Sequence, residues 1–130
     1  MYARQPKSPF HAWAIAQIAG LVSTEAAALS AASLAELCSE DGIDSAKLPT
    51  DISDFGIHLL DIPAAAAVRC GEAYRKYRQK RKQDSGKDAP KMPLPDFFIG
   101  AHAELLGVEL VTNDPQRFQT YFPKVILITP

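Results

Sequence analysis

Two aspartates, Asp96 and Asp114, stand near the ends of residues 94–114, a stretch whose pattern predicts a helix, a glycine stop and a short strand. Pro95 suits the first position of a helix, which places Asp96 in the positive N-terminal turn. Asp114 follows a β-prone run and precedes a proline, as is typical of a turn. If that strand is parallel and central, Asp114 lies at its carboxyl end, where ligands bind in open α/β sheets, and Asp96 can point into the same crevice. Carboxylates that gather in one crevice repel one another unless a cation neutralises them.

Taken alone, the two aspartates are explained more simply as a helix N-terminal charge and a turn residue. The pattern of the whole segment favours a functional interpretation. It reads LPDFFIGAHA from residue 94, LG at 106, LVTND from residue 110 and FQTYFP from residue 118. This pattern closely resembles the C-terminal half of the PIN-domain ribonucleases, and most of all the VapC toxins of bacterial toxin–antitoxin pairs. The resemblance covers residues 10–130 and is specific in the last forty.

The resemblance implies an α/β fold of three layers, a parallel sheet flanked by helices, formed by residues 1–130 as a single domain. The sequence agrees, because strand-like and helix-like runs alternate along the chain. Ser8 is placed to cap the first helix. The predicted helices are 6–22, one from residue 33, 64–82, one from residue 94 to the stop at Gly107, and 115–121; the predicted strands are 26–31, 55–60, 109–112 and 125–128.

Glu36 has two possible roles. Ser33 and Glu36 have the spacing of a capping box, so the simplest role for Glu36 is to cap its own helix. In the PIN family, however, a Leu-Ala-Glu-Leu helix after the second strand supplies one of the active-site carboxylates, and Glu36 matches that position. Because the C-terminal match is strong, we favour the functional role.

The resemblance implies that Glu36, Asp96 and Asp114 are catalytic residues and metal ligands, and that the Thr112 hydroxyl orients a carboxylate or the attacking water. Oxygen ligands suit hard cations, so Mg²⁺ or Mn²⁺ is the expected ion. Such an ion activates a water molecule and stabilises charge on the scissile phosphate. The implied reaction is metal-dependent endonucleolytic cleavage of RNA.

Three further residues lie on the helix that carries Asp96. Gly100 and Ala103 share its face, and their small size is expected to let the helix approach the sheet closely beside the metal. His102 falls on a different face, so we expect it to pack or to form a hydrogen bond rather than to act in catalysis.

One family feature has no counterpart in this chain. PIN domains begin with a strand in the middle of the sheet, which ends in a metal-binding aspartate, whereas Met1 to Pro6 correspond to the region after it. We expect weaker metal binding and two unpaired strand edges as a result. We consider three explanations: a start codon or chain boundary set too late, a natural inactive remnant, or a strand supplied by a partner or a second copy. We favour the first.

The net charge of −1 conceals an asymmetry. Residues 1–68 hold three basic and eight acidic side chains, whereas residues 69–130 hold eleven basic and seven acidic ones. This asymmetry suggests a polyanionic partner. Cys38 and Cys70 have neither metal-ligand nor secreted-disulfide spacing, so we expect reduced thiols in a cytoplasmic protein. No stretch approaches the roughly 18 apolar residues of a membrane span.

The basic side chains are concentrated in residues 75–82. They are either the solvated end of a helix or a phosphate-contacting patch, with Tyr74 and Tyr77 available to stack on unpaired bases, and the two interpretations are about equally supported. The candidate RNA-binding residues are Arg75, Lys76, Arg78, Lys80, Arg81 and Lys82.

The leading hypothesis is therefore a VapC-like endoribonuclease toxin, weakened or inactive without the first-strand aspartate. The resemblance implies a transfer or ribosomal RNA substrate, a cognate antitoxin protein and a homodimer. The alternative is a non-catalytic PIN remnant that binds an antitoxin or RNA. A nuclease acting on DNA is a third, weaker hypothesis.

Overall fold

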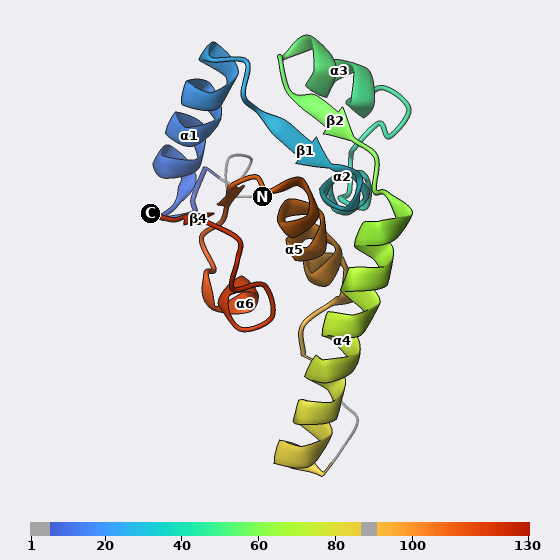
Figure 1. Ribbon diagram of the computed structural model, residues 1–130. Coiled ribbons are helices and arrows are strands. Elements are labelled where there is room, and N and C mark those ends of the chain that lie inside the picture. The colour runs from blue at the N-terminus through green and yellow to red at the C-terminus, as the bar shows by residue number, and fades with distance from the viewer. Residues whose placement is uncertain (1–5, 87–90) are drawn as a thin grey trace. The chain divides into compact units, whose positions relative to one another are not determined.

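The computed structural model describes residues 6–86 and 91–130, which form helices and short strands (Figure 1). The chain divides into two compact units, Met1–Asp61 together with Pro130, and Ile62–Thr129. Each unit contains one pair of parallel strands. The predicted α/β class with parallel strands is thus confirmed, whereas the assignment of residues 1–130 to one domain stays a prediction.

The first unit is built around the strand pair β1–β2, in which Leu29 lies opposite Leu59. Both strands are shorter than predicted. The expected cap at Ser8 is wrong: the first helix begins at His11, and the Ser8 hydroxyl accepts a hydrogen bond from the amide of Phe10 instead. The elements are α1 (His11–Ser23), β1 (Ala28–Ser30), α2 (Ala31–Cys38), α3 (Leu48–Asp54) and β2 (His58–Leu60).

The second unit pairs a long helix, α4, with α5, which packs along it (Figure 1). Gly107 ends α5 with a φ of 63°, a conformation that costs glycine little, so the predicted helix stop is confirmed. The strand that follows pairs in parallel with the last strand, and Leu110 lies opposite Leu127. The elements are α4 (Ala64–Ser85), α5 (Leu94–Leu106), β3 (Leu110–Val111), α6 (Gln116–Gln119) and β4 (Leu127–Ile128).

Aromatic rings form the core of the second unit. Phe97 is fully buried, and its ring centroid lies 5.1 Å from that of Tyr74, 5.3 Å from that of Tyr77 and 5.5 Å from that of Tyr121. Such tilted and edge-on ring pairs add to the free energy gained by burying apolar surface. Because Phe97 directly follows Asp96, this packing also fixes the start of α5.

The strands differ from the expected sheet in one respect. Within residues 6–86 and 91–130, β3 is hydrogen-bonded only to β4, and β1 only to β2. The prediction of a central position for β3 is therefore not met by the described strands.

Candidate active site

Asp96 lies in the first turn of α5, as predicted. The helix begins at Leu94 after the extended Pro93, so Pro95 takes the second helical position instead of the first. The backbone amide of Asp96 donates to the carbonyl of Pro93, and its side chain is only 11% exposed. A carboxylate that is largely removed from water requires a compensating charge or hydrogen bonds.

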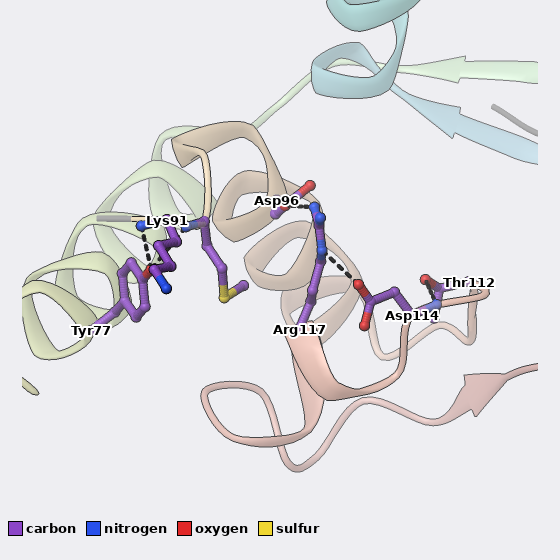
Figure 2. Close-up of polar contacts among 7 residues, drawn as sticks. Tyr77, Lys91, Asp96, Thr112, Asp114 and Arg117 are labelled. Atoms are coloured by element: carbon purple, nitrogen blue, oxygen red, sulfur yellow. Dashed lines mark hydrogen bonds and ion pairs between the residues drawn. The ribbon is translucent and has the colours of Figure 1, made fainter. Parts of the chain in front are cut away.

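Asp114 lies in the turn between β3 and α6. Its backbone amide donates to the Thr112 hydroxyl over 3.1 Å, so Thr112 shapes the turn that carries Asp114 (Figure 2). The expected role of this hydroxyl is to orient a carboxylate or a water molecule, whereas its hydrogen bond in the structure is to the backbone. The Asp114 side chain is 44% exposed and is directed toward Arg117 (Figure 2).

A single guanidinium joins the two aspartates. Nη1 of Arg117 lies 2.5 Å from Oδ2 of Asp96, and Nε of Arg117 lies 2.7 Å from Oδ2 of Asp114 (Figure 2). Both contacts have hydrogen-bond geometry as well as opposite charge, which makes them stronger than neutral hydrogen bonds. The structure therefore brings together Asp96 and Asp114, which are 18 positions apart in the sequence.

Arg117 changes the electrostatics of the pair. Burial alone lowers the pKa of Arg117, but the nearby charge of Asp96, with hydrogen bonds to Asp96 and Asp114, outweighs burial and raises that pKa above its ordinary value. The guanidinium stays protonated at any physiological pH. Two carboxylates and one cation leave a net charge of −1 on the three side chains.

Sequence reasoning missed Arg117. Its spacing of three residues from Asp114 was a usable signal, because side chains at i and i+3 face each other across a helical turn. Its pairing with Asp96 depends on how α6 packs against α5, and no local pattern predicts that contact.

The arrangement does not, as it stands, fit a divalent ion. The carboxylate oxygens of Asp96 and Asp114 are the ligands that Mg²⁺ and Mn²⁺ prefer, but Arg117 is hydrogen-bonded to one oxygen of each. No cluster of three or more His, Cys, Asp or Glu side chains suited to a metal is present in the part of the chain that the structure describes.

Glu36 belongs to the first unit, where it is exposed on α2. The capping box predicted for it is wrong, because α2 begins three residues earlier than that motif requires. The helix is capped by Ser30, whose hydroxyl accepts from the amide of Ala32, and Ser33 lies inside the helix. A capping role for Glu36 is thus excluded. That Glu36 acts together with Asp96 and Asp114 stays a prediction.

The basic end of α4 is largely exposed, as a phosphate-contacting patch requires. Arg75, Arg78 and Lys82 line a shallow depression of about 260 Å³ together with Gln79. Lys76 and Lys80 are also exposed, and Arg81 is half-buried.

Tyr77 cannot stack on RNA bases, contrary to the prediction, because it is only 6% exposed. Its ring packs against Phe97 and Tyr121, and its hydroxyl accepts hydrogen bonds from the backbone amides of Lys91 and Met92 at 2.7 and 2.8 Å (Figure 2). Tyr77 therefore ties the segment that precedes α5 to α4, and it helps to position Asp96.

Gly100 has a different neighbour from the one expected. It faces the ring of Phe122, which fills the space beside it, and not a strand. His102 is buried, in agreement with a packing role. Arg69 supports the same region: it donates to the Glu104 carboxylate at 2.7 Å and to the Tyr121 carbonyl at 2.8 Å, and its guanidinium lies 5.0 Å from the centre of the Phe122 ring.

The fold is that of an α/β domain with parallel strands, and comparison with known proteins defines the family. The family model of the PIN domain matches residues 6–122, so the chain belongs to the PIN-domain family. The predicted family is confirmed. No curated protein gives a significant match.

A solved structure supports the fold. The chain is similar to a chain in the crystal structure of VapBC2 from Rickettsia felis bound to a DNA fragment from their promoter, with a TM-score of 0.60 and 21% sequence identity. The match covers 98% of this chain and 90% of the other. Within residues 6–86 and 91–130, no helix is both long and apolar enough to cross a membrane.

Proposed function

We propose that this chain is a Mg²⁺- or Mn²⁺-dependent endoribonuclease, the VapC-type toxin of a toxin–antitoxin pair. The observation that carries the proposal is that Asp96 and Asp114 lie close together, both paired with the guanidinium of Arg117, in a chain that matches the PIN family. The similarity in fold to the VapBC2 structure supports the toxin–antitoxin assignment.

The proposed catalytic residues are three carboxylates and one hydroxyl. In this proposal Glu36, Asp96 and Asp114 supply the carboxylate oxygens. Thr112 holds the turn that presents Asp114. We assign Mg²⁺ or Mn²⁺ because these donors are all oxygens, and oxygen donors favour hard cations over Zn²⁺ or copper.

RNA is the proposed substrate, of the transfer or ribosomal class. The exposed cations of α4 suit a phosphate backbone, because each one that contacts a phosphate releases a condensed counterion. We extend the proposal to a cognate antitoxin, a homodimer and a cytoplasmic location, all of which follow from the VapC assignment. The proposed RNA-binding residues are Arg75, Lys76, Arg78, Lys80, Arg81 and Lys82.

A non-catalytic binding module is the second candidate. The observation that favours it is Arg117 itself, because a guanidinium already neutralises the two aspartates that a metal would need. In that case the chain would bind RNA or an antitoxin without turnover.

A cleavage assay separates the two candidates. The full chain is incubated with transfer RNA, ribosomal RNA or DNA in Mg²⁺, Mn²⁺ or a chelator, beside Asp96→Asn and the control Asp54→Asn, whose side chain is exposed on α3. We expect metal-dependent cleavage of RNA by the wild type and by Asp54→Asn. Asp96→Asn should be slower by about a hundredfold or more, the scale seen when one charge-stabilising group is lost. RNA binding without cleavage in either metal would instead support the binding module, and cleavage of DNA alone would reject the choice of substrate.

A further inference from the structure

The contact of Arg117 with both aspartates is the feature that the proposed function does not use. A guanidinium is a fixed fork of donors, and here its Nη1 and Nε atoms each meet a different carboxylate. It thereby occupies the region from which a cation would contact both oxygens. Arg117 and a metal ion held by these two oxygens exclude each other.

The position of Arg117 also makes it easy to release. It lies on α6, a helix of four residues, and its side chain is 45% exposed, whereas that of Asp96 is only 11% exposed. Rotation about the side-chain bonds of Arg117 carries the guanidinium into water without displacing a buried residue. Asp96 has no such freedom, because Phe97 beside it is fixed in the aromatic cluster.

Release of Arg117 without replacement is unfavourable. A largely buried Asp96 carboxylate would then face Asp114 with no counter-charge, and a buried unpaired charge is strongly destabilising. A divalent ion removes that penalty because it brings two positive charges to the same oxygens. The exchange of one cation for another is therefore the favourable route.

We propose that Arg117 is a built-in counter-ion that neutralises Asp96 and Asp114 and must leave both carboxylates before a divalent cation binds. This inference rests on the proposed function, since it assumes that the two aspartates are metal ligands. It adds an autoinhibitory contact to that site. Metal affinity is then set partly by how easily Arg117 is displaced, and it is lower than the carboxylates alone would give.

Mn²⁺ titration by calorimetry tests the proposal on the full chain. The variants are Arg117→Gln, Arg117→Lys and the matched control Lys124→Gln, which removes one positive charge from an exposed position of the same unit. We expect Arg117→Gln to bind Mn²⁺ about tenfold more tightly than the wild type, because the competing cation is gone. Arg117→Lys keeps the charge but loses the planar fork, so its affinity should be intermediate, and Lys124→Gln should match the wild type.

Circular dichroism spectra recorded beforehand show whether each variant is folded. If Arg117→Gln is unfolded without metal, Arg117→Lys carries the test, and it must bind more tightly than the wild type. An affinity that is unchanged or weaker in the folded Arg117 variant overturns the proposal. Two failures can be told apart: equal binding by the wild type and the variant rejects only the role of Arg117, whereas no binding by any variant also rejects Asp96 and Asp114 as a metal site.

Discussion

Gly100 of α5 lies directly against the ring of Phe122. A Cβ atom built on Gly100 would be under 3.0 Å from three atoms of that ring, closer than real Cβ contacts allow. The same ring contacts Phe97 on one side and the Arg69 guanidinium on another. The absence of one side chain on α5 thus allows the segment after α6 to pack beside the helix that carries Asp96.

Gly100→Ala should therefore destabilise the protein. The ring of Phe122 cannot move without disturbing the buried cluster, so we expect the free energy of unfolding to fall by about 1–3 kcal/mol, as for other overpacked cores. Gly71→Ala is the matched control, because Gly71 lies inside α4 and a methyl group added there would have nothing within 4 Å. It should raise the free energy of unfolding by about 0.5–1 kcal/mol through helix propensity. Urea denaturation of both variants measures the difference, and equal effects would contradict this account of the packing.

Tyr77→Phe should loosen the start of α5. It removes the acceptor of the Lys91 and Met92 amides while it keeps the ring in place, so the cost is that of unsatisfied donors, about 1–3 kcal/mol. Tyr74→Phe is the control, since Tyr74 packs its ring in the same cluster and its hydroxyl forms no hydrogen bond to a described residue. Thermal unfolding compares the two. A Tyr77→Phe variant as stable as Tyr74→Phe would show that the hydrogen bonds from Lys91 and Met92 to the Tyr77 hydroxyl do not stabilise the protein.

Alkaline pH should destabilise the fold through Cys70. Burial raises the pKa of this thiol above its ordinary value of 9.0, so the folded state keeps a proton that the unfolded state releases. The contribution of the protonated Cys70 thiol to stability is fully present below pH 9.0 and is lost as the pH rises through the raised pKa. The free energy of unfolding then falls by at most about 1.4 kcal/mol per pH unit.

The measurement is the pH dependence of urea unfolding above pH 9, in the wild type and in Cys70→Ala. The pKa of Tyr121 is raised from 10.0 chiefly by burial, and by the nearby Tyr77 and Asp84, so it adds a similar loss at higher pH in both proteins. The Cys70→Ala variant should show a flatter decline just above pH 9 whatever its absolute stability. Identical slopes would mean that the thiol does not titrate differently in the two states.

Local signals in the sequence predicted much of the fold. Proline and glycine marked the start and end of α5, because their backbone preferences act within a few residues. The cap of α2 was misplaced since Ser30 and Ser33 both have suitable chemistry, and only the end of β1 at Ser30 shows which one precedes the helix. Short strands were predicted at the right places but not to the right length.

The site was predictable only in part. The types and spacing of Asp96 and Asp114 identified two members, whereas the cation between them could not be foreseen in full. The pair of Asp114 and Arg117 is local, but the pair of Asp96 and Arg117 spans 21 positions and depends on tertiary packing. The buried environment of Tyr77 was missed for the same reason, because Phe97 and Tyr121 approach it from distant parts of the chain.

Glu36, Asp96 and Asp114 are proposed to act together in metal-dependent cleavage of RNA. The most direct test is to measure the cleavage rate in Mn²⁺ for Glu36→Gln, Asp96→Asn and the double variant, with Glu25→Gln as a control in the first unit. Substitutions of residues that act as one catalytic unit have non-additive effects on the rate. The two single variants should therefore lose about the same factor in cleavage rate, and the double variant should be little slower than either. A Glu36→Gln variant that cleaves RNA as fast as the wild type, or losses that multiply in the double variant, would contradict a shared site.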